Sequence, residues 1–338
     1  MIRFLPLLSL FFATFCWAQN SAGPTLANVL KKGFVECAVA PAVPGFSTVD
    51  SKGEFKGLET DICRAVSAAI FGDASHAKFV PTNGAQRLPI LQSGQVDLVV
   101  EVLTQTLTRE AANGLLFTGV SFYDGQGFLV RKSSGAKTAK DLDGASICVA
   151  SGSTSELNLA DWAHANNLKI NPVVFERTEE GRDAYNAGRC DAYSTDSSQL
   201  AAIATRTKDP ENQVILPDII SKEPLGPAVR QGDDQWYEIV KWTLNALIEA
   251  EEQGVTQANV DEKLKSDNAA TKRLLGVTGD FGRFMALDNK WAYNAIKSVG
   301  NYGEIFDRSL GQNGVLKLPR GKNALWNRGG LLYSPPIR

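Results

Sequence analysis

The sequence contains few of the residues on which most catalytic and metal sites depend. Histidine occurs twice in 338 residues, as His76 and His164, and neither has neighbours in the chain at metal-ligand spacing. We therefore read both histidines as structural or surface residues. Ser–His or Cys–His nucleophilic catalysis has little material to use, and the cysteine spacings do not match zinc sites. The sequence predicts neither a metal nor a cofactor.

Long apolar runs and an excess of one charge are also missing. Beyond the first residues, no apolar stretch has the length that a membrane-spanning helix needs. The chain has 35 Lys and Arg against 37 Asp and Glu, a formal net charge of −2. This balance indicates no surface for nucleic acid or for an anionic membrane, and we expect a monomer.

Residues 1–18 have the pattern of an export signal. One positive charge at Arg3 precedes an apolar run from Phe4 to Phe15, and a small residue, Ala18, precedes Gln19. We expect cleavage near Ala18 and a periplasmic mature protein. Lipid attachment at Cys16 is disfavoured because the bulky Phe15 precedes it.

The mature chain keeps four cysteines, an even number that suits disulfide bonds in an oxidising compartment. They are Cys37, Cys63, Cys148 and Cys190. Four cysteines allow three pairings, and metal binding is the rival use. A faint internal duplication favours the pairs Cys37–Cys63 and Cys148–Cys190.

This duplication has two parts, which occur in the same order. A glycine precedes an apolar, cysteine-bearing strand in residues 33–39 and again in 144–149. A helix end, a glycine and an aspartate then open a strand in residues 91–97 and again in 185–191. Two similar α/β lobes are therefore predicted.

Helical patterns fall between these strands. Apolar residues recur at helical spacing in residues 61–70, 155–165 and 236–248. Alternating strands and helices favour two open, doubly wound sheets. Because ligands of such sheets lie beyond the carboxyl ends of the strands, facing lobes would hold a ligand between them.

The strand in the segment DLVVEVLTQTLTRE (97–110) ends in an unusually polar tip. Arg109 can hold a carboxylate through two parallel charge-assisted bonds, and the hydroxyl of Thr104 can assist it. In the second half, Ser153 and Glu156 form a capping-box pattern at a helix start, where Thr154 and unpaired N–H groups also suit a carboxylate. Asp196 supplies the opposite charge. Together these groups match the zwitterion of an α-amino acid, although a plain surface arginine and an ordinary capped helix explain the same residues singly.

Long segments of the chain resemble a known family. These are YDGQGFLV (123–130), ELNLADW (156–162), IISKEPLGPAVRQGDD (219–234), WTLNALIEAEEQGVTQANVDE (242–262), GNYGEIFDR (300–308) and NALWNRGGLLYSPPIR (323–338). The mature chain is similar to the periplasmic binding proteins of polar amino-acid ABC transporters, and in particular to the longer general L-amino-acid-binding subfamily (solute-binding protein family 3).

The resemblance implies an α/β fold of the two-lobed type II clamshell class, with two hinge crossings at 122–127 and 219–222. Lobe 1 would comprise residues 24–122, lobe 2 residues 123–221, and residues 222–338 would return to lobe 1 and add a C-terminal extension that packs its aromatic residues over it. The implied function is an amino-acid receptor that passes its ligand to a membrane permease and is not an enzyme.

The resemblance also implies roles for single residues. Arg109 and Thr104 correspond to the grip on the ligand α-carboxylate, Ser153 and Thr154 to the helix start that closes over it, and Asp196 to the acceptor of the α-ammonium group. Three positions depart from the pattern: Ala40 replaces a polar residue, Val102 a serine or asparagine, and Glu101 an arginine. Phe46, in the same segment as Ala40, is a further expected ligand contact.

Two interpretations of Glu101 stay open. It can face the pocket and favour a cationic side chain such as lysine, arginine or ornithine. Alternatively it can pair with Arg87, which leaves a neutralised pocket for glutamine, asparagine or an unusual amino compound. The alternative function is an exported dehydratase or lyase on the same fold, with Glu101 as general acid.

Overall fold

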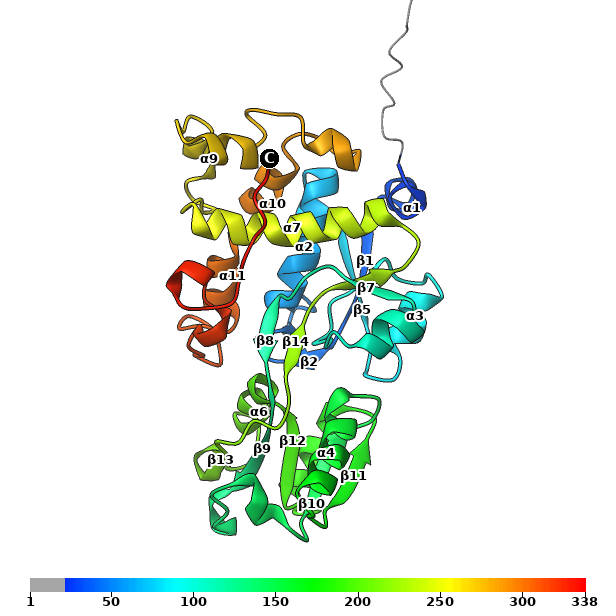
Figure 1. The fold of residues 1–338 in the computed structure, drawn as a ribbon, viewed down its shortest axis with the longest axis vertical. Coiled ribbons are helices and arrows are strands. Elements are labelled where there is room, and N and C mark those ends of the chain that lie inside the picture. Colours follow the sequence, from blue (N-terminus) through cyan, green and yellow to red (C-terminus); the bar gives the residue numbers. More distant parts are fainter. Residues whose placement is uncertain (1–21) are drawn as a thin grey trace, which may run out of the picture.

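The computed structural model describes residues 22–338, and the predicted export signal lies outside the described residues. The chain forms two lobes that lie one above the other along the long axis of the molecule and are joined by two neighbouring strands (Figure 1). Each lobe has a five-stranded sheet covered by helices, so the predicted two-lobed α/β class is confirmed.

Lobe 1 contains the sheet with the strand order β5-β1-β6-β15-β7. Strand β1 runs parallel to β5 and β6, whereas β15 runs antiparallel to β6 and β7. The sheet strands are β1 (Val35–Val39), β5 (Ala77–Pro81), β6 (Leu98–Val99), β7 (Leu115–Phe117) and β15 (Ala228–Arg230), and a small second sheet consists of β2 (Ala42–Val43), β3 (Ser47–Val49) and β4 (Phe55–Lys56). The helices are α1 (Pro24–Lys32), α2 (Leu58–Phe71), α3 (Arg87–Gln92), α7 (Asp234–Glu252), α8 (Val260–Lys263), α9 (Ala269–Leu274), α10 (Trp291–Val299) and α11 (Tyr302–Ser309).

Lobe 2 repeats this plan with the strand order β11-β10-β12-β9-β13. Strand β10 runs parallel to β11 and β12, and β9 runs antiparallel to β12 and β13. The strands are β9 (Gln126–Arg131), β10 (Ser146–Ala150), β11 (Asn171–Phe175), β12 (Ala192–Asp196) and β13 (Gln213–Ile215), and the helices are α4 (Thr154–Ala165), α5 (Thr178–Asn186) and α6 (Ser197–Ala204).

The internal duplication of the sequence is a repeat of structure. Its two parts fall on β1 and β6 in lobe 1 and on β10 and β12 in lobe 2, which hold the second and third places of their sheets. Asp97 accepts a hydrogen bond from the backbone N–H of Glu36 (2.8 Å), and Asp191 accepts one from that of Ser146 (2.8 Å). Each aspartate therefore fixes the start of the neighbouring strand, which explains why the sequence repeats it.

Both favoured disulfide bonds are present. Cys37 on β1 is bonded to Cys63 on α2, and Cys148 on β10 is bonded to Cys190 just before β12. Each bond lies within one lobe and connects the second strand of its sheet to a neighbouring segment. Each lobe is therefore cross-linked within itself, and within residues 22–338 no disulfide bond connects one lobe to the other.

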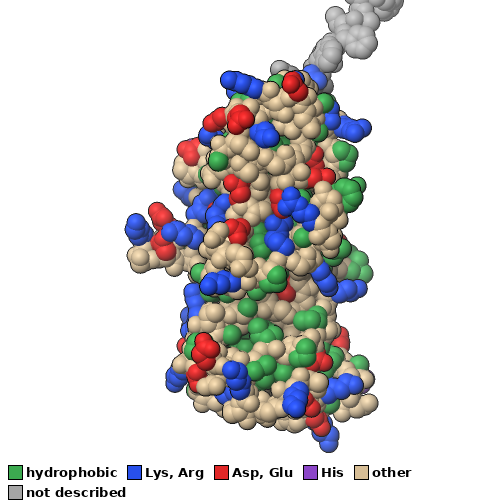
Figure 2. Space-filling view, turned by 90° about the vertical axis from the view of Figure 1, so that its left-hand side faces the viewer, with side chains coloured by type: hydrophobic (Ala, Val, Ile, Leu, Met, Phe, Trp, Pro, Cys, Tyr) green, Lys and Arg blue, Asp and Glu red, His purple; other side chains and the backbone are tan. Residues whose placement is uncertain are grey.

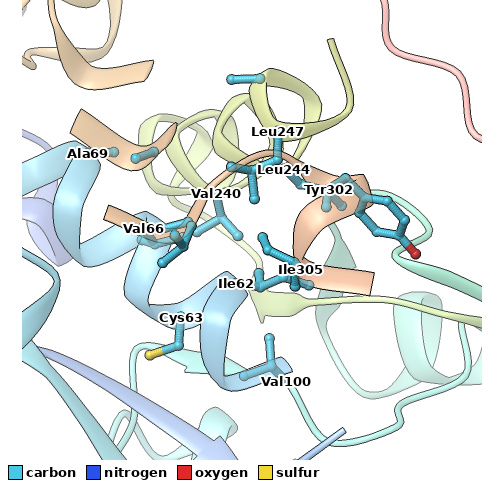
Figure 3. Close-up of a cluster of buried hydrophobic side chains, with 14 of the residues drawn as sticks. Ile62, Cys63, Val66, Ala69, Val100, Val240, Leu244, Leu247, Tyr302 and Ile305 are labelled. Carbon is cyan, nitrogen blue, oxygen red and sulfur yellow. The ribbon is translucent and has the colours of Figure 1, made fainter. Parts of the chain in front are cut away.

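The largest core lies in lobe 1 between its sheet and the helices α2, α7, α10 and α11 (Figure 3). Helix α2 places Ile62 and Val66 against Leu244 of α7, and α11 adds Tyr302 and Ile305. Helix α2 ends at Gly72, whose left-handed φ of 73° suits glycine. This core includes the chain beyond residue 258, so that the C-terminal part completes lobe 1.

The aromatic residues of the C-terminal extension are buried to different extents. Trp291, Tyr302 and Phe306 are buried in the core of lobe 1. Trp326 and Tyr333 are 51% and 63% exposed and pack against each other, with ring centroids 5.7 Å apart. This pair lies at the surface of lobe 1, where the Trp326 Nε1 donates to Glu252 of α7 (3.1 Å), so the extension covers lobe 1 with both buried and half-exposed aromatic side chains.

The two lobes are joined by β8 (Phe122–Asp124) and β14 (Glu223–Leu225), which pair in antiparallel fashion. The C-terminal extension contacts this hinge: the Asn323 side chain accepts from the backbone N–H of Tyr123 (2.7 Å) and donates to its carbonyl (3.1 Å). One end of the hinge is thus held by a residue 200 positions away in the sequence.

The surface has no strongly polarised face in the view of Figure 2, where acidic and basic side chains are interspersed and apolar side chains gather on lobe 2. None of the helices within residues 22–338 is both long and apolar enough to cross a membrane.

Candidate functional site

A cavity of about 300 Å³ lies between the lobes, at the carboxyl ends of the central strands of both sheets. Its lining comes from loops and helix starts that follow these strands, as expected for open α/β sheets. Among the lining residues are Ala40, Thr82, Arg87, Glu101, Val102, Thr104, Ser153, Thr154, Arg177, Asp196 and Gln199.

Most of the residues predicted from the sequence are therefore brought together. Eight of the ten line the cavity: Ala40, Arg87, Glu101, Val102, Thr104, Ser153, Thr154 and Asp196. Arg109 lies directly behind one of them, because its Nη1 donates to the carbonyl of Thr104 (2.6 Å). Phe46 does not reach the cavity; it is fully buried and packs edge-on against Phe122, with ring centroids 5.2 Å apart.

The cavity wall of lobe 2 begins with helix α4. The Ser153 hydroxyl accepts from the backbone N–H of Glu156 (3.2 Å), as a helix N-cap does. The predicted capping box is wrong in its second half: the Glu156 carboxylate accepts from the N–H of Gly152 (3.1 Å), one residue earlier than the cap itself. The first N–H groups of the helix, that of Thr154 included, remain directed away from the helix body, where a carboxylate can bind.

Arg109 lies on a short π-helical turn (Thr108–Ala112) in lobe 1 and is 6% exposed. Burial, together with the nearby Arg87, lowers the pKa of Arg109 to about 9. The guanidinium stays charged at neutral pH, but it is a buried cation with one described hydrogen bond. An anionic ligand would therefore relieve a desolvated charge.

Asp196 ends strand β12 and is 3% exposed. Gln199, which also lines the cavity, donates to its carboxylate (3.0 Å). Burial, with the carboxylates of Asp124 and Glu223 nearby, raises the pKa of Asp196 well above its ordinary value. A bound ammonium group would reverse this effect, since an adjacent positive charge favours the ionised carboxylate.

Glu101 and Arg87 meet at the lobe 1 end of the cavity, but not as an ion pair. Arg87 donates through Nη1 to the backbone carbonyl of Glu101 (2.7 Å), while the Glu101 carboxylate accepts from the Thr82 hydroxyl. Burial raises the pKa of Glu101. The Nε of Arg87 is buried and has no partner in the described part of the chain, and the residues Arg87 and Glu101 both line this end of the cavity.

Val102 stands next to them in a strained conformation. Its φ of 41° lies in the left-handed region, where a β-branched residue is rare. The backbone N–H of Val102 donates to the buried carboxylate of Glu59 (2.5 Å), and burial raises the pKa of Glu59 to about 8. Strained backbone of this kind concentrates at binding sites.

Sequence reasoning missed Glu223, which contacts two of the four residues predicted for the carboxylate site. Glu223 of β14 is 1% exposed, and its carboxylate accepts from the hydroxyls of Thr104 (2.6 Å) and Thr154 (2.9 Å) and from the amide of Asn158 (2.8 Å). Glu223 lies one residue beyond the hinge segment predicted over 219–222, and an acidic residue at that place was the available signal.

The lobes approach each other closely at the edge of the cavity. A Cβ placed on Gly84 of lobe 1 would lie 2.9 Å from the carbonyl oxygen of Ser151 in lobe 2, and Gly152 sits against Gly84 and Ala85. Thr104 and Thr154 are also within 3.3 Å through their hydroxyls. The lobes are thus in a closed arrangement around the cavity.

No metal site accompanies this cavity. Within residues 22–338, no group of three or more His, Cys, Asp and Glu side chains could hold a metal ion.

Two similar lobes, a two-strand hinge and a cavity between them that is lined by charged and hydroxyl-bearing side chains define a solute-binding protein of the clamshell class. Comparison with known proteins supports the same class: residues 35–258 match the bacterial extracellular solute-binding proteins, family 3, and the chain belongs to this family. The family consists of binding proteins, which decides against the enzyme alternative.

Several relatives match the chain over nearly its full length. It is 53% identical to the general L-amino acid-binding periplasmic protein AapJ of Rhizobium johnstonii, over 95% of both chains. It is 45% identical to the glutamate/glutamine/aspartate/asparagine-binding protein BztA of Rhodobacter capsulatus, over 98% of this chain and 99% of that protein. A periplasmic binding protein of an ABC transporter from Brucella ovis, solved with glutathione bound, is 50% identical, with a TM-score of 0.91 over 93% of this chain and 99% of that one.

Proposed function

We propose that the protein is a receptor for an L-amino acid or an amino-acid derivative, which it delivers to the membrane permease of an ABC transporter. The observation that carries the proposal is the pair of opposite charges at one cavity. Arg109 is a buried cation behind Thr104, and Asp196 is a buried carboxylate in the lining. An α-amino acid head group supplies one opposite charge to each.

The ligand carboxylate is assigned to Arg109 and to the backbone N–H groups of Thr104 and Thr154. The α-ammonium group is assigned to Asp196. Relatives described as amino-acid-binding proteins support this proposal, and a zwitterionic ligand would bring an opposite charge to each of these two buried groups.

The side-chain end of the cavity favours an amide. Arg87 lines this end of the cavity with a guanidinium that is only partly hydrogen-bonded, and the Glu101 carboxylate lies beside it. An amide carbonyl accepts from the first and an amide N–H donates to the second. Glutamine and asparagine meet this requirement, and so does the γ-glutamyl amide of glutathione, the molecule bound by the Brucella ovis relative.

We propose further that the protein acts in the periplasm after cleavage of its export signal near Ala18. The two intralobe disulfides fit an oxidising compartment, and the family is extracellular.

Calorimetry and thermal denaturation of the mature chain against glutamine, asparagine, glutathione, glutamate, lysine and arginine test both levels of the proposal. We expect micromolar or tighter binding of an amide ligand, and a saturating ligand at 100 times its Kd adds about 2.7 kcal/mol of stability. Lysine or arginine binding ten times more tightly would overturn the amide preference. Absence of stabilisation by every α-amino acid and by glutathione would overturn the receptor function itself.

A further inference from the structure

The predicted carboxylate site already contains a carboxylate that belongs to the protein. The hydroxyls of Thr104 and Thr154, both assigned to the ligand by family resemblance, donate to the same oxygen of Glu223, at 2.6 and 2.9 Å. The other Glu223 oxygen accepts from Asn158 (2.8 Å) and from the Ser221 hydroxyl (2.5 Å). The carboxylate is thereby fully supplied with donors.

These donors come from three different parts of the molecule. Thr104 belongs to lobe 1, Thr154 and Asn158 begin helix α4 of lobe 2, and Glu223 with Ser221 belongs to the hinge. In this arrangement a single side chain joins both lobes to the strand about which they turn. It is 1% exposed, so that water does not weaken these bonds.

The same contacts leave other donors free for a ligand. The backbone N–H groups of Thr104 and Thr154 donate to no group within residues 22–338. The Thr104–Gln105 peptide is fixed from both sides, because Arg109 donates to the Thr104 carbonyl (2.6 Å) and the Gln105 N–H donates to the Pro224 carbonyl (2.8 Å). With the hydroxyls turned toward Glu223, the ligand is left with the backbone N–H groups and the guanidinium.

We infer that Glu223 is a positioning residue that links lobe closure to ligand binding. It takes the Thr104 and Thr154 hydroxyls, holds the two lobes in the closed arrangement and presents their backbone N–H groups to the ligand carboxylate. The hydroxyls therefore act on the ligand through Glu223 and not by direct contact.

A double-mutant cycle separates these two roles of the hydroxyls. The variants are Thr154→Val, Glu223→Ala and their combination, with the Kd measured by calorimetry for the tightest amino acid of the panel. We expect a loss of at least tenfold in affinity for Glu223→Ala, three- to tenfold for Thr154→Val, and no further loss when Thr154→Val is added to Glu223→Ala. Losses that multiply in the double variant would overturn the inference, because they would mean that the hydroxyl contacts the ligand independently.

The affinity measurement rests on the proposed amino-acid function. The separation of the two lobes can be measured without any ligand. By solution X-ray scattering, ligand-free Glu223→Ala should have a larger radius of gyration than the ligand-free wild type. The matched control is Asp218→Asn, which removes a carboxylate that accepts from the Ala139 N–H (2.9 Å) entirely within lobe 2. The control should match the wild type, and equal radii for all three proteins would overturn the inference. A wild type that binds no amino acid would refute the proposed function and leave this comparison intact.

Discussion

Replacing Glu59 by glutamine should stabilise the protein, and the gain should grow as the pH rises. Glu59 lies in the first turn of α2, is 4% exposed and has one described hydrogen bond, from the Val102 N–H (2.5 Å); its Oε2 is buried without a partner. Burial raises the pKa of Glu59 from 4.5 to about 8. The folded protein therefore holds a proton that the unfolded chain releases above pH 4.5.

The sign and size follow from proton linkage. Between pH 4.5 and 8 the folded state binds more protons at this site than the unfolded state, so wild-type stability falls as the pH rises through this window. Relative to a side chain that never ionises, the penalty from such a pKa difference is about 1 kcal/mol at pH 5 and on the order of 4 kcal/mol at pH 8. Glutamine keeps the acceptor for Val102 and removes the penalty.

Thermal unfolding of both proteins from pH 5 to pH 8 measures the difference. With roughly 2 °C per kcal/mol for a chain of this size, the Tm advantage of Glu59→Gln should rise by about 6 °C across the range. Glu54→Gln, a change at an exposed carboxylate of the same lobe, is the control and should track the wild type at every pH. An advantage that stays constant or shrinks toward pH 8 would refute the reasoning.

Three other changes test the cavity, the contact between the lobes and one of the disulfide bonds. Arg109→Lys removes the fork geometry that suits a carboxylate and should weaken amino-acid binding by about ten- to a hundredfold, or 1.4–3 kcal/mol; calorimetry within twofold of the wild type would contradict this. Gly84→Val inserts a side chain where a Cβ would already lie 2.9 Å from the Ser151 carbonyl oxygen. We expect weaker ligand binding in calorimetry, and unaltered affinity would mean that the lobes need not meet there. Replacing Cys148 and Cys190 by serine removes a disulfide bond that closes a loop of sequence separation 42. Denaturant titration should show a free energy of unfolding lower by about 4 kcal/mol. A loss below about 1 kcal/mol would mean that this bond contributes little to stability.

Local pattern accounts for the parts of the fold that the sequence predicted. The helix predicted over 61–70 spans residues 58–71, and the helix predicted over 155–165 begins one residue earlier. Apolar spacing and glycine ends depend on neighbours a few residues apart, so they can be read directly from the chain. The repeated Gly-x-x-Asp segments before β6 and β12 identified two similar sheets for the same reason.

The site was predicted as a set of residues but not as a set of contacts. Thr104, Thr154 and Asp196 lie at strand ends or helix starts. In open α/β sheets such positions meet at the carboxyl edge of the sheet, where ligands bind. Phe46 was predicted to contact the ligand, but its ring is buried in the core against Phe122. Glu101 and Arg87 were weighed as an ion pair, whereas the guanidinium binds a backbone carbonyl, a choice that no spacing encodes.

The sequence by itself determined two stapled α/β lobes, the positions of their strand ends and the charges available there, because each depends on short-range periodicity, capping and composition. Only the tertiary structure decided which of those polar groups form hydrogen bonds with one another. Glu223 lies 119 residues from Thr104 and 69 from Thr154, and Asn323 reaches the hinge across 200 residues. Such contacts exist only once the lobes have folded and closed, since packing and desolvation then fix which donor each buried carboxylate receives.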